Sequence, residues 1–174
     1  MKVKRTEQIQ ICENDELRKL THLSKNLYNK ANYIIRQEFF HNKWWIRYND
    51  LDKIMNSSKN YRSLPAATSQ QILRLLDRSW NSFFRSIKKW KKRSEKFIEI
   101  PKLPKYKKKD SEHILIFTNQ QCIIENGLLK FPRLINLELE TRLKEVNLRE
   151  VRIVPQGVGY IAEIVYEIED SKEQ

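Results

Sequence analysis

The middle of the chain carries a helical pattern of apolar and basic positions. At about 100° per residue, seven positions fall within an arc of about 80°, and these are Ser69, Ile72, Leu76, Trp80, Phe83, Ile87 and Trp90. The basic residues that cluster on roughly the opposite side are Arg74, Arg78, Arg85, Lys88, Lys89 and Lys92. This pattern predicts a helix from about Ala67 to about Lys96, about 45 Å long at 1.5 Å per residue. One face of that helix would be buried and the other would expose a row of cations.

Two further elements are predicted before this helix. Residues 2–11 alternate between apolar and polar positions over their second half, which favours a short strand. Asn14 or Asp15 then suits a helix N-cap, and apolar residues repeat at helical spacing from there to about His41. We therefore expect a strand followed by a long amphipathic helix.

The connection between the two long helices is expected to be mostly polar. Trp44 and Trp45 lie at its start, and this pair would either cap the helical core or stack on bases. A short helix is predicted at residues 48–55, beginning at Asn49 or Asp50, and residues 56–63 are predicted to form a loop.

After Asp110 the pattern changes to that of strands. Asn126-Gly127 lies between two apolar runs, and this dipeptide predicts a type I′ hairpin because both residues tolerate positive φ. The expected strands cover residues 113–117, the two halves of 122–131, 135–141, 148–154 and 160–168. The acidic residues among them alternate with apolar ones, as on the solvated face of a sheet.

The order of elements is therefore one strand, a block of helices, and five or six strands. A lone N-terminal strand is marginal by itself, so we expect it to join the later sheet. The fold class that follows is α+β, a small antiparallel β-barrel interrupted by a helical insertion. The expected domains are residues 1–12 for the first strand, 13–100 for the insertion and 101–174 for the rest of the barrel.

The positive charge is concentrated in one stretch. The formal net charge is +12, and residues 85–109 contain 12 basic and 2 acidic residues. The basic run continues past the helix through the proline-marked segment IPKLPKYKKKD, which we expect to be an extended linker that touches another surface. Such a concentration indicates a polyanionic partner. The alternatives are an ordinary solvated helix face and a membrane surface, and burial of the Trp- and Phe-rich face in protein is favoured over the membrane.

Several classes of chemistry lack a sequence signal. Cys12 and Cys122 are far apart and form no zinc-ligand spacing, so we expect two reduced core cysteines and no metal or cofactor. His22, His41 and His113 have no adjacent catalytic partner, and no glycine-rich phosphate loop occurs. Neither a signal peptide nor a membrane span is visible, which favours a cytoplasmic protein.

The candidate site is thus a phosphate-contacting surface without catalytic residues. Arginine forks and lysine ammonium groups contact phosphates without reading bases. The predicted contact residues are Arg74, Arg78, Arg85, Lys88, Lys89, Lys92, Arg93, Lys102, Lys105, Tyr106, Lys107, Lys108 and Lys109. Tyr48 and Trp44 are candidates for stacking or for reading a sequence motif.

Four stretches of the sequence resemble, in order, the N-terminal half of TnpB proteins. They are WIRYNDLDKI, LPAATSQQILRLLDRSWNSFFRSIKKWKK, IPKLPKYKKKD and HILIFTNQQCIIENGLLKFP, and YIAEIVYEIE resembles the strand before the nuclease domain. TnpB proteins are transposon-encoded, RNA-guided DNA nucleases. The resemblance implies an OB-like β-barrel, the wedge domain, interrupted by a helical recognition domain. It also implies binding of a structured guide RNA and of target DNA beside a short motif.

The chain differs from that family at its C-terminal end. A RuvC-like nuclease domain with three metal-binding acidic residues follows in TnpB proteins, whereas this sequence ends before any of them. We therefore expect a nucleic-acid-binding module that is not an enzyme by itself. Two alternatives stay open: a subunit that docks onto a separately encoded RuvC-like nuclease domain, and a decayed transposon fragment.

Overall fold

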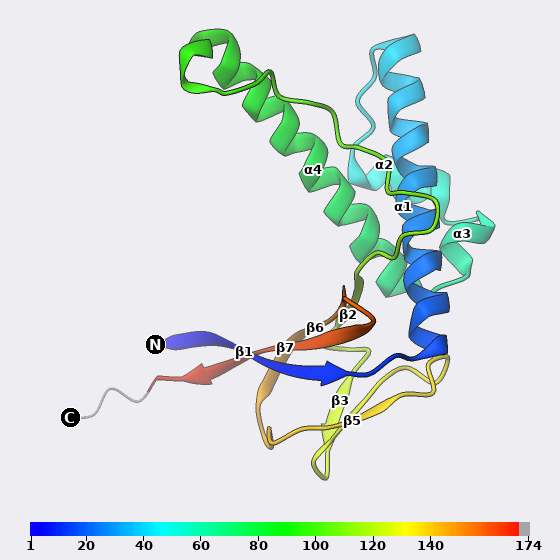
Figure 1. The fold of residues 1–174 in the computed structure, drawn as a ribbon, viewed down its shortest axis with the longest axis vertical. Helices are drawn as coiled ribbons and strands as arrows, with labels where there is room; N and C mark the ends of the chain where they lie inside the picture. The colour runs from blue at the N-terminus through cyan, green and yellow to red at the C-terminus, as the bar shows by residue number, and fades with distance from the viewer. Residues whose placement is uncertain (171–174) are drawn as a thin grey trace.

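The computed structural model describes residues 1–170 and has an α+β fold (Figure 1). The helices are α1 (Asp15–Asn42), α2 (Tyr48–Met55), α3 (Lys59–Arg62) and α4 (Ala66–Lys92), followed by a 3₁₀ turn, η1 (Ser94–Lys96). The strands are β1 (Lys2–Ile11), β2 (Leu115–Thr118), β3 (Ile123–Glu125), β4 (Leu128–Lys130), β5 (Glu138–Glu140), β6 (Asn147–Gln156) and β7 (Gly159–Glu169). None of the helices within residues 1–170 is both long and apolar enough to cross a membrane.

The strands form two antiparallel sheets. The larger sheet has the order β1-β7-β6-β2, and the smaller has the order β3-β4-β5. The N-terminal strand does join the later sheet, since β1 pairs with β7 along its whole length, from Lys2 opposite Glu169 to Ile11 opposite Tyr160. Both sheets are open, so the strands of the described residues do not close into a single barrel.

At two places in the sheets the local backbone geometry favours asparagine or glycine. Asn126 and Gly127 have φ values of 52° and 73° and connect β3 to β4, as the hairpin prediction required. Gly159 begins β7 beside the end of β1, where an added Cβ would lie 2.4 Å from the carbonyl oxygen of Ile11. Glycine is needed there because the two backbones approach closely.

The helix starts agree only partly with the sequence. Asn14 caps α1 by accepting a hydrogen bond from the backbone N–H of Leu17 at 2.9 Å, as predicted. Neither Asn49 nor Asp50 caps α2, which begins one residue after Arg47. The predicted loop at residues 56–63 contains the single-turn helix α3, capped by the Ser58 hydroxyl. The bounds of α2 confirm the predicted helix at residues 48–55, whereas α3 was missed because a four-residue helix gives few signals in local composition.

Helix α4 is buried along its first half only. Its 27 residues span about 40 Å, and it ends at Lys92 rather than at Lys96. Ser69, Ile72, Leu76 and Trp80 are buried as predicted, whereas the more distal residues of the same stripe are only half-buried. In the view of Figure 1, α1 and α4 separate with distance from the sheets, which leaves the far part of each helix less covered.

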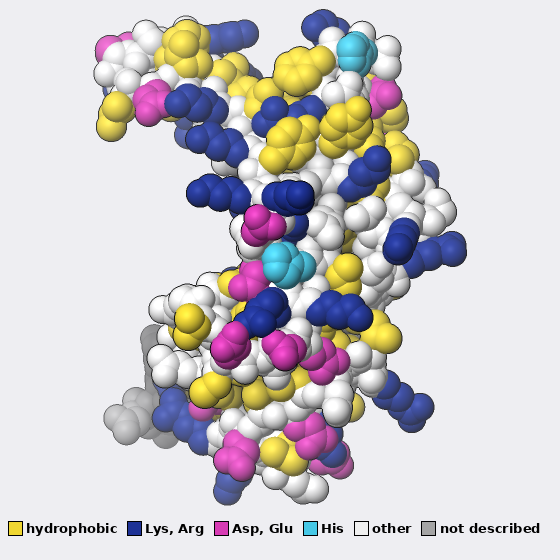
Figure 2. Space-filling view, turned by 45° about the vertical axis from the view of Figure 1, so that its right-hand side comes forward, with side chains coloured by type: hydrophobic (Ala, Val, Ile, Leu, Met, Phe, Trp, Pro, Cys, Tyr) yellow, Lys and Arg dark blue, Asp and Glu magenta, His cyan; other side chains and the backbone are white. Residues whose placement is uncertain are grey.

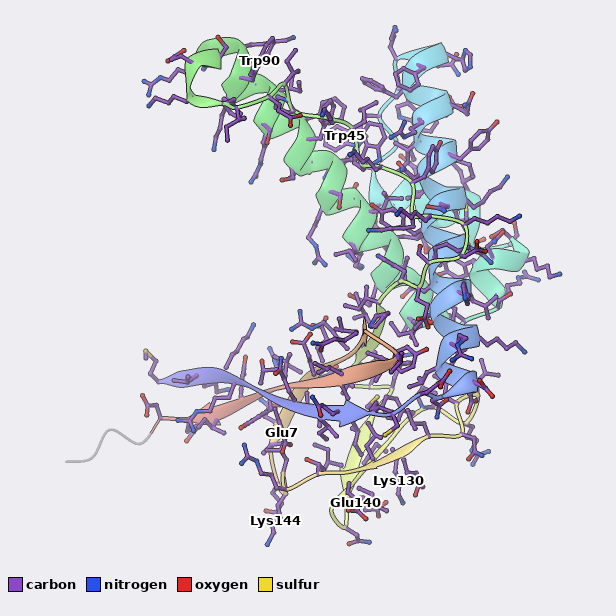
Figure 3. The ribbon with its side chains drawn as sticks, viewed as in Figure 1. Glu7, Trp45, Trp90, Lys130, Glu140 and Lys144 are labelled. Carbon is purple, nitrogen blue, oxygen red and sulfur yellow. The ribbon has the colours of Figure 1, made fainter. Side chains whose placement is uncertain are left out.

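Aromatic rings fill the space where the two helices begin to separate. Phe84 has its ring centroid 5.5 Å from that of Phe39, 4.5 Å from that of Trp45 and 5.9 Å from that of Trp80. Trp45, labelled in Figure 3, therefore belongs to the helical core, which is the first of the two roles predicted for the tryptophan pair. Its neighbour Trp44 is 44% exposed.

The two cysteines lie in different environments. Cys122 is buried in the core, and burial raises the pKa of its thiol to about 12. Cys12 is exposed at the end of β1, so the prediction of two core cysteines is wrong for this residue. A cysteine next to a strand end gives no sequence signal of which side it faces.

Candidate nucleic-acid interface

Six of the seven basic residues of α4 form one exposed row on the side opposite the core. The residues of this row, which we call the α4 row, are Arg74, Arg78, Arg85, Lys88, Lys89 and Lys92, and all are exposed, as is Arg93 just beyond the helix. Within residues 1–170, none of them forms an ion pair with a carboxylate. Their charges are therefore available to a partner from outside the chain.

The one carboxylate of α4 is engaged elsewhere. Asp77 accepts hydrogen bonds from Nε and Nη2 of Arg47 at 3.1 and 3.2 Å. It also accepts from the backbone N–H of Tyr48 at 3.1 Å, which supplies the missing cap of α2. Asp77 thus joins α4 to α2, and its charge is matched by Arg47 instead of by the α4 row.

The two stacking candidates differ in how accessible they are. The guanidinium carbon of Arg74 lies 3.9 Å from the ring centroid of Tyr48, so one face of this ring is already covered by a cation. Burial, followed by the nearby Asp52 carboxylate, raises the pKa of the Tyr48 phenol. No cation of residues 1–170 covers the Trp44 ring in this way, and Trp44 is the more exposed of the two.

The linker carries the second group of predicted contact residues. Its backbone lies along α1, as expected of a segment that touches another surface, while the side chains of its predicted contact residues stay exposed. These exposed residues are Lys102, Lys105, Tyr106, Lys107, Lys108 and Lys109. Lys102 differs from the others because its ammonium is paired with Glu99, although both side chains are about two-thirds exposed and such pairs are weak.

Two ring contacts fix parts of the linker. The guanidinium carbon of Arg36 lies 4.7 Å from the ring centroid of Tyr106, and the ammonium of Lys107 lies 5.1 Å from that of Tyr28. Both are cation–π distances. Tyr106 therefore has less ring surface open to a base than its sequence position suggested.

Positive and negative side chains occupy different parts of the surface. On the face shown in Figure 2, Lys and Arg side chains gather over the helical upper part, whereas most Asp and Glu side chains lie lower, over the sheets. Two acidic residues of β7 are paired with arginines of β6: Glu163 with Arg152 at 3.5 Å and Glu167 with Arg149 at 3.2 Å. The Glu163 and Glu167 side chains are only 22% and 12% exposed, so these two residues are half-buried partners of arginines and not part of a fully solvated face.

A small pocket at the end of α4 adds residues that the sequence did not single out. It has a volume of about 470 Å³ and is lined by Lys89, Lys92, Arg93, Lys96 and Phe97. Lys96 was expected only as the last residue of the helix. The turn η1 folds it back toward the helix end, which no periodicity could indicate.

The residues considered for other chemistry stay apart. Within residues 1–170 no three His, Cys, Asp or Glu side chains are grouped as a metal would require. His113 is buried, with its ring centroid 4.8 Å from that of Tyr28. Its Nδ1 lies 3.1 Å from the Ser24 hydroxyl, which donates to the Ile114 carbonyl at 2.7 Å. This serine is hydrogen-bonded into the core, as a structural residue would be.

No protein-family model matches this chain, and no curated protein is significantly similar to it. The resemblance to TnpB proteins, and the functions that it implies, therefore stay predictions.

Proposed function

We propose that this chain is a nucleic-acid-binding module that binds the phosphate backbone of structured RNA through the α4 row and the linker. The observation that carries the proposal is the state of the α4 row: six cations on one face of one helix, all exposed, with no carboxylate of residues 1–170 paired to them. A row of like charge is costly unless a polyanion neutralises it. A straight cationic helix face suits a phosphate backbone.

The spacing along the helix supports the same partner. From Arg74 to Lys92 the α4 row extends over about 27 Å at 1.5 Å per residue. This length is enough to contact several phosphates of one strand or of two strands across a groove. The contacts would be largely independent of sequence, since arginine and lysine would meet phosphates and not base edges.

The resemblance to TnpB proteins extends the proposal to particular partners. On this proposal the two sheets are the OB-like wedge barrel, opened in this chain, and the helices are the recognition insertion. The RNA is then a guide scaffold, target DNA lies beside it, and Tyr48 and Trp44 lie where a short DNA motif would be read. Cleavage would require a RuvC-like nuclease domain, which this chain would adjoin or dock onto.

The experiment that tests the proposal compares two triple charge reversals. The first, Arg78→Glu with Arg85→Glu and Lys89→Glu, reverses the middle of the α4 row. The second, Lys19→Glu with Lys53→Glu and Lys59→Glu, makes the same change of net charge at exposed lysines of α1, α2 and α3. Binding of a fluorescein-labelled RNA hairpin is measured at near-physiological salt, and circular dichroism checks that both variants fold.

The first triple variant is expected to lower RNA affinity at least about tenfold, and the second to lower it far less. Unchanged affinity of a folded first variant would remove the proposal. Equal losses in the two variants would also contradict it, because they would show a response to net charge and not to the α4 row.

A further inference from the structure

The linker has no regular secondary structure, yet its backbone is held at several points by side chains of α1. Asn29 makes two of these contacts: its Nδ2 donates to the carbonyl of Lys107 at 2.9 Å, and its Oδ1 accepts from the N–H of Lys107 at 2.8 Å. One amide side chain thereby satisfies both backbone groups of one residue, as a neighbouring strand would.

Further contacts continue in both directions from Asn29. Asn32 Nδ2 donates to the Pro104 carbonyl at 3.0 Å, and Arg36 Nη2 donates to the same oxygen. In the other direction, the ammonium of Lys25 donates to the carbonyl of Lys109. Asn32 is itself fixed, because its Oδ1 accepts from the Trp80 indole.

The four α1 residues are spaced to follow one stripe of the helix. Positions 25, 29, 32 and 36 are separated by four, three and four residues, which places them on one face. They extend over about 16 Å of helix at 1.5 Å per residue, and residues 104–109 reach at most about 20 Å when extended. The linker and α1 run in opposite directions, and this match of lengths lets one helix hold an extended segment.

The side chains of α1 contact the backbone of the linker and leave the charged side chains of the linker exposed. Lys105, Lys107 and Lys108 are exposed, although the carbonyls and amides around them are bound to α1. A pocket of about 360 Å³ lies between the linker and α4, with Pro104 and Lys102 on one side and Ser79 and Ser82 on the other. The linker is therefore held beside α4, so its cations and the α4 row belong to neighbouring surfaces.

We propose that Asn29, Asn32 and Arg36 are positioning residues that fix the linker in an extended form, so that its lysines meet phosphates without first being ordered. This inference rests on the proposed function. A lysine-rich segment without such contacts is mobile, and ordering its backbone costs conformational entropy at every residue. Because α1 orders the linker when the protein folds, the entropy of ordering is lost at folding and not at RNA binding. The affinity for RNA rises without any new contact to the ligand.

The test uses Asn29→Ala, because Asn29 lies at the helix surface and alanine favours helix. The matched control is Asn26→Ala, an exposed asparagine of α1 whose side chain makes no hydrogen bond within residues 1–170. Hydrogen exchange and trypsin cleavage at residues 105–109 report whether the linker is released. Titration with the same labelled RNA hairpin reports its effect on binding.

Asn29→Ala is expected to speed exchange at the Lys107 amide about fivefold to tenfold and to weaken RNA binding about threefold to tenfold. Asn29→Asp keeps the acceptor for this amide but loses the donor to the Lys107 carbonyl, so its exchange should lie between wild type and Asn29→Ala. Asn26→Ala should change neither quantity. Wild-type exchange in Asn29→Ala, or a released linker with unchanged affinity, would overturn the inference.

A second variant separates this inference from the proposed function. Lys105→Gln with Lys107→Gln and Lys108→Gln removes linker charge and leaves Asn29 in place. If this variant and the reversed α4 row both bind RNA as wild type does, the proposed function fails. If they weaken binding and Asn29→Ala does not, only the positioning role of α1 is contradicted.

Discussion

Trp80 donates its indole N–H to Oδ1 of Asn32 at 3.0 Å, and neither side chain has measurable exposure. The bond joins α4 to α1 within the aromatic core. The other end of the same amide holds Pro104 of the linker. A single buried asparagine therefore connects the helix that carries the α4 row to the segment that carries the other cations.

The first prediction concerns this asparagine. Asn32→Ala leaves the buried indole N–H without an acceptor, removes one of the two donors to the Pro104 carbonyl, and also leaves a small cavity. The free energy of unfolding should fall by about 2–4 kcal/mol, as measured by urea denaturation followed by tryptophan fluorescence. The exposed control Asn26→Ala should change it by less than about 0.5 kcal/mol. A loss below about 1 kcal/mol for Asn32→Ala would show that the buried amide contributes little.

The second prediction concerns the cap that α4 provides for α2. Asp77→Ala removes the acceptor for the Tyr48 N–H and the partner of Arg47, and it should cost about 1–2 kcal/mol of unfolding free energy. Asp77→Asn keeps an oxygen acceptor, so its cost should be clearly smaller. Urea denaturation of both variants gives the comparison. Equal costs would mean that the ion pair, and not the cap, supplies the stability.

Much of the fold follows from periodicity, and the exceptions have identifiable causes. The long helices α1 and α4 were placed to within one residue except at the end of α4, and the hairpin at Asn126-Gly127 was placed correctly. Many residues contribute to each of these signals. The cap of α2 was missed because its acceptor, Asp77, is 29 residues away from Tyr48. No local pattern can show a partner that only tertiary packing brings close.

In the candidate site, too, the sequence predicted what depends on a single helix and missed what depends on contacts between distant segments. The sequence placed the α4 row on an exposed face, since opposed apolar and basic positions are a property of the helix alone. It did not show that Asn29 holds Lys107. An asparagine on a helix surface looks like an ordinary solvated residue until the segment opposite to it is known. Contacts between distant segments are thus the part of a site that a single sequence does not contain.

The third prediction concerns pH. Burial, with a smaller contribution from the nearby Lys107 ammonium, lowers the pKa of His113 to about 4, against about 6.5 in an unfolded chain. Below pH 6.5 the unfolded state binds more protons than the folded state, so stability falls as the pH falls from 6.5 to about 4. The total loss from this group is about 3 kcal/mol.

The measurement compares wild type with His113→Phe. Urea denaturation between pH 7 and about 4 should show the wild type losing about 3 kcal/mol more than the variant, since both contain the same carboxylates. Parallel curves for the two proteins would contradict a buried, neutral His113.

The fourth prediction concerns the junction of β1 and β7. Gly159→Ala would place a methyl group against the Ile11 carbonyl oxygen, and backbone atoms cannot move aside without disturbing strand pairing. The cost should be about 1–3 kcal/mol. Gly157→Asn is the control, because Gly157 has a φ of 59° with open space around its Cβ position and asparagine tolerates this conformation. A smaller cost at Gly159 than at Gly157 would contradict the close approach.

The central claim is that the α4 row neutralises phosphates, and the salt dependence of RNA binding tests it most directly. Each phosphate contact contributes about 0.7 to 0.9 to the slope of log affinity against log salt concentration. Replacing Arg78, Arg85 and Lys89 by glutamine should therefore reduce the steepness of that slope by about 2 to 3, in a protein that stays folded. A slope equal to that of the wild type would show that these side chains do not contact the phosphate backbone.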